Sequence, residues 1–232
     1  MPASKDPSAF RNRAHEVSRL EAFSDVIFGF AVSLLVVSLE APKSYEELME
    51  MMHGMLAFAF CFFIFIDVWF EHHRFFQRYA LQDNVVVPLN TILLFVVLFY
   101  VYPLKYVFTL VANGITGHHA RLGAGQATTL FTIYGLGFMA IFTLIGLMYL
   151  RAYRKRDELG LNEAEVIDTK ESIYDNFATG AVGLLSLIVA HTPLVALSGF
   201  IYFIIAIPKT FIPQVMRRKR RLATAAMSPL PT

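Results

Sequence analysis

Charged and polar side chains that lie in or beside long apolar runs are the residues best suited to chemistry in this chain. The first run opens with several of them, in the stretch RLEAFSDVIFGFAVSLLVVSLE at residues 19–40. Across the chain the set is Arg19, Asp25, Asp67, His72, His73 and Asn90. Aspartate and histidine could relay protons here, because histidine titrates near neutral pH. A proton-relaying site is therefore one interpretation of this set.

The same residues also have a structural interpretation, because charge inside a membrane is costly. Polar groups at such depth usually face the interior of a helix bundle and pair with one another. We therefore expect the six to form one hydrogen-bonded layer. Arg19 and Asp25 are six residues apart and so lie on different faces of one helix, and the partner of Asp25 is expected on a neighbouring helix. For Arg19 and the two histidines, the alternative is that they reach out to the lipid headgroups.

Two histidine pairs, His72–His73 and His118–His119, raise the further possibility of a membrane enzyme that holds a metal or haem. The distribution of Lys and Arg along the chain predicts that the two pairs lie on opposite sides of the membrane, and no other histidine supplies ligand spacing to either pair. The chain also has no glycine-rich phosphate loop and no serine-nucleophile motif. We therefore expect no enzyme activity, no bound metal and no cofactor.

The composition predicts an integral membrane protein. Of the 232 residues, 56% are hydrophobic and 16% are charged, whereas an average soluble domain carries about 25% charged residues. The single cysteine, Cys61, excludes an intramolecular disulfide. The basic C-terminal stretch is expected to anchor the chain at anionic lipid rather than to bind nucleic acid.

Six apolar runs predict an all-α membrane protein, a bundle of six transmembrane helices. Barrel strands would instead alternate apolar and polar residues. The expected spans are Ala22–Leu39, Met51–Phe70, Val85–Tyr102, Leu130–Leu150, Phe177–Ala190 and Leu194–Ile207. Ser18 and Glu21 have the spacing of a capping box, which predicts a helix start just before the first span. The stretch LNEAEVID, between the fourth and fifth spans, predicts a short surface helix.

The placement of Lys and Arg sets the predicted orientation. Of the 20 such residues, only Lys43, Lys105 and Arg121 fall in connections on one side, and the other 17 fall on the opposite side. Both termini are therefore expected in the cytoplasm, in a multi-pass protein of the cell (inner) membrane. The expected organisation is an N-tail at 1–17, a membrane domain at 18–216 and a basic C-tail at 217–232.

One face of the first span carries a continuous apolar stripe. Its members follow the alternating spacing of a helix face and are Phe23, Ile27, Phe30, Leu34 and Val37. Asp25, Gly29 and Ser33 form a second line at intervals of four, and small residues so placed permit close helix contact. By periodicity alone, both lines are packing surfaces.

The start of the first span also resembles a known motif. Arg19-x-x-x-Phe23-Ser24-Asp25 is similar to the RxxxFSD motif of the transmembrane protein 175 family of potassium channels. The second and third spans extend the resemblance through Trp69, His72, His73, Asn90 and Pro103. The six-span layout is similar to the single-repeat, prokaryotic members of that family, which form homotetramers. The resemblance therefore implies a passive potassium channel, with potassium as its permeating ion.

The resemblance also implies where the pore lies. In the family, the first helix of each of four subunits lines the pore, which narrows at a hydrophobic gate. Counting from Asp25, the pore-facing positions are Phe30, Ser33, Leu34 and Val37. Phe30 is a departure, because family members typically carry Ile or Leu there, and four Phe rings could dewet or plug the pore. Ser33 stands where Thr is common, and its hydroxyl could contact a partly dehydrated cation.

A different function remains open from the residues alone. The Asp and His layer could serve a proton-linked carrier or a proton-permeable channel. A carrier of this kind would be expected to contain interrupted spans in paired halves, and the sequence shows no such inverted repeat.

Overall fold

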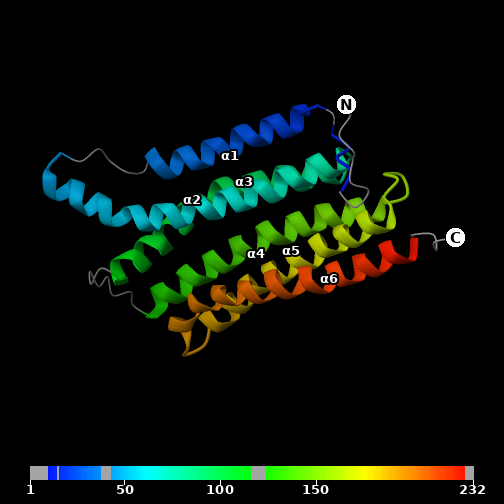
Figure 1. Ribbon diagram of the computed structural model, residues 1–232. Helices are drawn as coiled ribbons and strands as arrows, with labels where there is room; N and C mark the ends of the chain where they lie inside the picture. The colour runs from blue at the N-terminus through cyan, green and yellow to red at the C-terminus, as the bar shows by residue number, and fades with distance from the viewer. Residues whose placement is uncertain (1–9, 15, 38–42, 116–123, 228–232) are drawn as a thin grey trace.

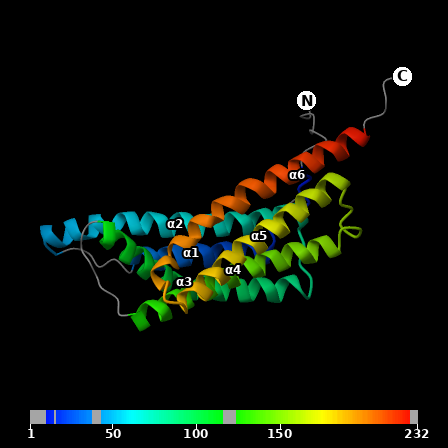
Figure 2. The same ribbon diagram turned by 90° about the horizontal axis from the view of Figure 1, so that it is seen from below.

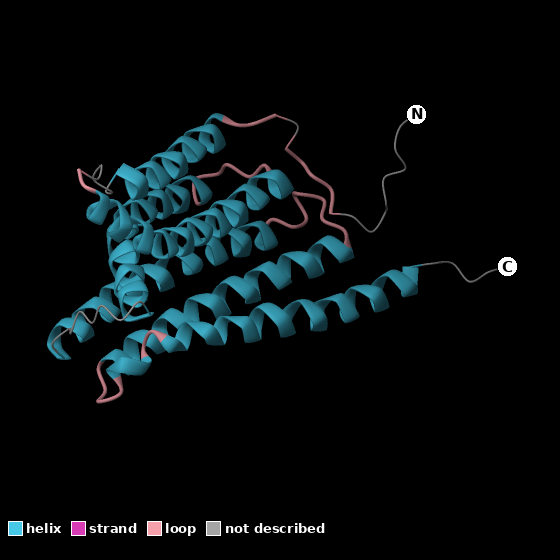
Figure 3. Ribbon diagram, turned by 60° about the vertical axis from the view of Figure 1, so that its left-hand side comes forward, coloured by secondary structure: helices cyan, strands magenta, loops and turns pink. Residues whose placement is uncertain are grey.

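The chain folds into long helices. The structure is a computed structural model that describes residues 10–14, 16–37, 43–115 and 124–227. Within those residues there are helices, turns and loops and no strands (Figure 3). The α-helices are α1 (Arg19–Val37), α2 (Tyr45–Tyr79), α3 (Val86–Ile115), α4 (Ala124–Arg154), α5 (Glu163–Ala190) and α6 (Ala206–Met227). Two short 3₁₀ helices, η1 (Val195–Leu197) and η2 (Phe200–Ile205), precede α6. The all-helical class predicted from the sequence is confirmed for these residues.

The helices form an elongated bundle in which α1 lies to one side (Figures 1 and 2). Its extensive contacts are with α2 and α3, whereas α4 packs mainly against α5 and α3. Along α5 runs α6, which carries the chain to its C-terminal end. The α1 helix is therefore held by the α2–α3 pair on one side and is left uncovered on the other.

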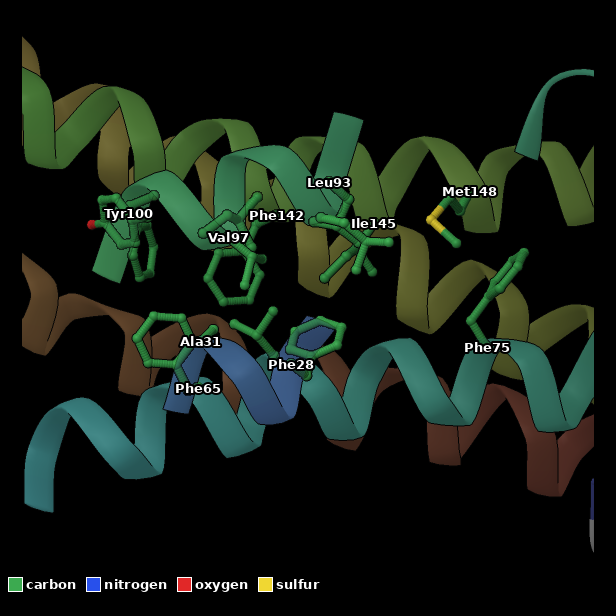
Figure 4. Packing of buried hydrophobic residues seen from close by; sticks show 14 of the residues in the cluster. Phe28, Ala31, Phe65, Phe75, Leu93, Val97, Tyr100, Phe142, Ile145 and Met148 are labelled. Carbon is green, nitrogen blue, oxygen red and sulfur yellow. The ribbon is translucent and has the colours of Figure 1, made fainter. Parts of the chain in front are cut away.

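A shared apolar core joins α1 to the rest of the bundle. Figure 4 shows Phe28 and Ala31 of α1 directed into the same interior as Leu93 and Val97 of α3 and Ile145 of α4. These five side chains are almost completely buried. Lipid is as apolar as these residues, so close packing rather than removal from water stabilises the core.

Glycines allow α4 and α5 to approach very closely. A Cβ atom on Gly183 would lie 2.9 Å from the backbone oxygen of Gly135, and one on Gly135 would lie 2.8 Å from the backbone oxygen of Gly183. Real Cβ atoms do not tolerate such contacts with backbone. The pair therefore fixes the spacing of these two helices, as small residues do at membrane helix interfaces.

Three of the described helices contain stretches long and apolar enough to cross a membrane, namely Val86–Tyr106, Gly125–Arg154 and Glu163–Ala190. These stretches overlap the third, fourth and fifth predicted spans. The second predicted span is only the middle of α2, which has 35 residues. At 1.5 Å per residue, α2 is roughly 52 Å long, well beyond the ~30 Å hydrocarbon core. His72 and His73 therefore lie within the helix and not beyond its end.

The later helices begin and end at residues other than those predicted from the sequence. The predicted sixth span, Leu194–Ile207, is mostly 3₁₀ helix, and the α-helix begins only at Ala206. It continues to Met227, so the predicted boundary between residues 216 and 217 falls inside α6. The stretch LNEAEVID is not a separate surface helix but the start of α5. There Asn162 and Glu165 cap each other's backbone N–H in a capping box, a local signal strong enough to start the long helix early.

Candidate functional site

The α1 helix has one buried face and one exposed face. The buried positions recur at intervals of three and four and are Glu21, Ser24, Phe28, Ala31 and Leu35. On the opposite side, Phe23, Val26 and Phe30 are 58%, 68% and 53% exposed. Helical periodicity places these two sets on different faces of one cylinder.

One buried hydrogen-bond chain connects α1, α3 and α2. The Asn90 side-chain amide donates to Ser24 Oγ at 2.9 Å, and Ser24 Oγ donates to the Leu20 carbonyl at 2.7 Å. Asn90 Oδ1 lies 2.7 Å from His72 Nε2. Since that amide oxygen can only accept, the ring hydrogen of His72 belongs on Nε2. Asn90, Ser24 and His72 are all buried. This chain of hydrogen bonds, the buried lock, therefore holds α1, α2 and α3 together.

A second set of contacts joins α1 to α2 beside the first. Trp69 Nε1 donates to Asp25 Oδ1 at 2.8 Å, so the partner of Asp25 is on a neighbouring helix, as expected. The Trp69 ring stacks on His73, with ring centroids 5.2 Å apart. His73 Nδ1 lies 3.3 Å from Glu21 Oε1, an ion-pair distance when the imidazole is protonated. Ser24 and Asp25 of the FSD motif thus accept hydrogen bonds from different helices, α3 and α2.

The prediction of a single polar layer is wrong in two respects. Arg19 is exposed in the first turn of α1 and makes no hydrogen bond or ion pair with the side chains that the structure describes. Asp67 belongs to another contact, with Lys209 of α6, whose Nζ lies 2.9 Å from Asp67 Oδ2. The helical periodicity of α2 separates Asp67 from His72, because five residues turn the side chain to a different face.

The predicted helix start at Ser18 is confirmed. Ser18 Oγ accepts the backbone N–H of Glu21 at 3.1 Å, which satisfies one of the free N–H groups at the start of α1. The Glu21 side chain lies beside His73. The carboxylate of Glu21, the acidic residue of the predicted capping box, therefore contacts α2.

The exposed face of α1 carries three of the four residues expected to face a pore. Phe30 and Ser33 are exposed and Leu34 is half-buried, while the side chain of Val37 lies outside the described residues. Ser33 Oγ donates to the Gly29 carbonyl at 2.9 Å. Its single hydrogen is thus used within the helix, and its two lone pairs are free to accept from or contact another group. Gly29 is exposed, and a Cβ atom there would meet nothing within 4 Å. At Gly29, therefore, the predicted line of small residues does not pack on another of the described helices.

A separate ion pair ties the start of α3 to the end of α4. Asp83 accepts the backbone N–H groups of Val85 and Val86 through Oδ1 and the Nε–H of Arg151 through Oδ2, the last at 2.7 Å. Burial alone would raise the pKa of Asp83. The hydrogen bonds from Val86, Arg151 and Val85 outweigh that effect and hold its pKa below the usual value.

The described residues contain no group of three or more His, Cys, Asp or Glu side chains that could hold a metal ion. His118 and His119 lie outside the described residues. Sequence reasoning missed a different cluster, in which Arg11 and Arg13 pair with the buried Glu165. The Asn162–Glu165 spacing was a usable signal for the start of α5, but nothing local marks the two arginines as its partners.

Comparison with known proteins points to one family. The family model described as endosomal/lysosomal potassium channel TMEM175 matches residues 19–100. A protein of Marivirga tractuosa named potassium channel is 40% identical over 230 residues, covering 92% of this chain and 93% of its own length. A potassium channel of Chamaesiphon minutus is 29% identical over 131 residues, or 53% of this chain and 63% of its own length.

Solved structures agree with the sequence comparison. The crystal structure of an alanine variant of the potassium channel MtTMEM175, in complex with a nanobody–MBP fusion protein, superimposes with a TM-score of 0.79. It is 37% identical, and the match covers 90% of this chain and 97% of that one. A lysosomal potassium-selective channel TMEM175 homologue from Chamaesiphon minutus shares the fold, with a TM-score of 0.56 at 24% identity over 85% of this chain and 96% of that one.

The matched region contains the RxxxFSD motif, the Trp69 contact and the chain of hydrogen bonds through Asn90. The relatives are potassium channels, a class of transporter and not of enzyme. Together with the long apolar helices, they mark a membrane protein. The chain belongs to the TMEM175 family of potassium channels.

Proposed function

We propose that this chain is the subunit of a homotetrameric, passive potassium channel whose pore is lined by α1 of each of four copies. The observation that carries the proposal is the uncovered face of α1. Phe30 is 53% exposed there, although α1 is otherwise packed on α2 and α3. Four such faces around one axis would enclose a narrow conduit.

The residues on that face suit a hydrophobic gate with a polar step. Phe30 and Leu34 would form apolar rings that exclude water when the conduit is narrow. Ser33 lies between them with its lone pairs free, since its hydrogen is donated to the Gly29 carbonyl. These oxygens could replace part of the hydration shell of a potassium ion. We include Val37 in the lining on its spacing from Leu34.

The polar contacts behind α1 would set its rotation about its own axis. Asn90 holds Ser24 and Trp69 holds Asp25, on two neighbouring positions of the helix. A rotation that moved Phe30 away from the axis would break both contacts. His72 and His73 belong to the same contacts. We place Arg19 and Phe23, which are exposed at the start of α1, near the cytoplasmic end of the pore.

The membrane arrangement is inferred from the charge distribution. We propose six spans, with both termini in the cytoplasm and the chain in the cell (inner) membrane. Residues 1–17 and 217–232 would then lie on the cytoplasmic side of the membrane domain at 18–216. Anionic lipid is the expected neighbour of the basic residues 217–221.

Ion flux in liposomes tests the proposal. Purified wild-type protein should pass potassium down its gradient, and both Phe30→Ala and Leu34→Ala should change the flux per channel. Phe203→Ala is the matched control, since Phe203 on η2 is 78% exposed and η2 packs against α5 and α6 and not extensively against α1. Absence of flux from wild type and both variants would refute the proposal.

A proton-linked carrier is the second candidate, favoured by the proximity of His73 to Glu21 next to Asp25. It predicts saturable potassium exchange driven by a pH gradient. A channel instead predicts flux that follows the potassium gradient at equal pH on both sides. Histidine replacement separates the two, because His73→Gln should abolish only carrier-type exchange.

A further inference from the structure

The segment that precedes α1 is anchored to the opposite half of the bundle. We name residues 10–14 the N-terminal strap. In Figure 1 it runs from the start of α1 toward the loop that joins α4 to α5. The backbone N–H groups of Arg13 and Ala14 both donate to the Gln77 carbonyl near the end of α2, at 3.1 and 3.2 Å.

Glu165 is the main anchor of the strap. Its side chain is only 2% exposed and lies 3.0 Å from Arg11 Nη2 and 2.8 Å from Arg13 Nη2. The same carboxylate accepts the Asn162 N–H and so completes the cap of α5. Arg13 further donates to the Leu159 carbonyl at 2.9 Å. A buried carboxylate with two arginine partners is costly to separate from them, because it would be left charged and unpaired.

An aromatic contact reinforces the anchor on the α2 side. The Phe10 ring meets Tyr79 edge-on, with centroids 5.5 Å apart. The guanidinium of Arg78 lies over the Phe10 ring at 4.7 Å, and that of Arg13 lies 5.7 Å from its centroid. Cations over aromatic faces are attracted by the ring quadrupole. The strap is thus fixed by charge, by backbone bonds and by ring contacts at once.

The strap ends only five residues before α1 begins at Arg19, so its anchor bears on the position of that helix. Ser18, four residues after the strap, already caps α1. Apart from the strap, α1 makes its extensive contacts only with α2 and α3 among the described elements. The strap therefore joins the start of α1 to α5 through a short connection.

We propose that the strap is a positioning element, in which Arg13 and Glu165 set where α1 sits on α2. In consequence, the α4–α5 loop and α1 move together. The expected effect on potassium flux rests on the proposed function, since it requires α1 to line the pore. The expected effect on the position of α1 does not depend on the proposed function.

The chain contains its own reporter of that position. Trp69 is the only tryptophan, and its indole N–H donates to Asp25 of α1. A displaced α1 would free this indole and change its surroundings. Intrinsic fluorescence therefore reads the α1–α2 contact directly, far from the mutated residues in sequence.

The test compares the double variant Arg11→Ala/Arg13→Ala with wild type in detergent and in liposomes. Both substitutions lie on the strap, so the α5 capping box stays intact. Arg13→Lys, which keeps a cation for Glu165, is the rescue variant. Asp83→Asn is the matched control, because it removes an ion pair at the α3–α4 junction that does not involve the strap.

We expect the double variant to shift the Trp69 emission maximum and to raise quenching by acrylamide. Arg13→Lys and Asp83→Asn should both resemble wild type. Potassium flux per folded channel should change in the double variant by roughly twofold to thirtyfold, the range for coupling through packed elements. Unchanged Trp69 emission in a folded double variant would overturn the proposal.

A purely stabilising strap gives a different pattern. It would lower the thermal stability of the double variant while Trp69 emission and flux per folded channel stayed at wild-type values, and this result also overturns the proposal. If the double variant does not fold, Glu165→Gln replaces it, because the amide still accepts from Asn162 but loses both ion pairs. A Trp69 shift without a change in flux supports positioning by the strap and contradicts the pore assignment of α1.

Discussion

Replacement of Asn90 by leucine tests the buried lock between α1, α2 and α3. Asn90 is fully buried, and it is the acceptor for His72 Nε2 at 2.7 Å and the donor to Ser24 at 2.9 Å. In Asn90→Leu, the buried ring hydrogen of His72 loses its acceptor, which costs about 1–3 kcal/mol. Ser24 loses less, because its own hydrogen still goes to the Leu20 carbonyl.

The magnitude sets an order among variants. Asn90→Leu should lower the free energy of unfolding by about 1–3 kcal/mol, which corresponds to a fall in melting temperature of roughly 2–12 °C for a chain of this size. Ser24→Ala leaves the buried Asn90 amide hydrogen without its acceptor and should likewise cost about 1–3 kcal/mol. Thr91→Val is the control, because Thr91 is the next residue on α3 and is exposed.

The single cysteine supplies the assay. Cys61 is fully buried in α2, so a thiol-reactive dye labels it only when the bundle opens. A thermal ramp with such a dye in detergent gives the melting temperature of each variant. These hydrogen-bond assignments would be refuted if Asn90→Leu or Ser24→Ala melted with wild type, or if Thr91→Val were as destabilised as either.

Three further variants probe other contacts. Trp69→Phe should lower the melting temperature in the Cys61 dye assay, because Asp25 loses a hydrogen bond worth about 0.6 kcal/mol; an unchanged value would argue against that contact. Gly183→Leu should prevent assembly of the bundle, seen as aggregation in size-exclusion chromatography, and a monodisperse variant would contradict the close α4–α5 packing. The stabilising effect of Asp83 is measured as the difference in melting temperature between wild type and Asp83→Asn. It should be complete above about pH 4 and lost as the pH falls further, because the pKa of Asp83 is lowered in the folded protein. A difference in melting temperature that grows in acid would contradict this.

Some of the site could be predicted from the sequence because its signals are local. The run from Ser18 to Asp25 carries its own cap and its own motif, and the cap is found as expected. The periodicity of α1 separates its two faces, and Phe30 lies on the exposed one. A polar residue as deep as Asn90 needs partners, and that requirement alone anticipates a buried contact.

Other contacts depend on the packing of distant segments and leave little local trace. Arg11 and Glu165 are 154 positions apart, and an arginine before a span is equally well explained as a topology signal. Lys209 lies close in sequence to the C-terminal charge cluster, but it pairs with Asp67 of α2. Residues 194–207 are as apolar as a span, and for that reason the sequence predicts a helix there. Pro193 and Gly199 interrupt regular helix formation, and most of the segment is 3₁₀ helix instead.

Thiol modification at Ser33 tests whether the uncovered face of α1 lines the potassium pathway. The variant is Ser33→Cys in a Cys61→Ala background, treated in liposomes with a cationic methanethiosulfonate reagent, with Phe203→Cys as the control. A pathway lined by this face predicts that modification blocks potassium flux in Ser33→Cys, that a high potassium concentration slows the block, and that labelled Phe203→Cys conducts normally. Stoichiometric labelling of Ser33→Cys with unchanged flux would contradict it.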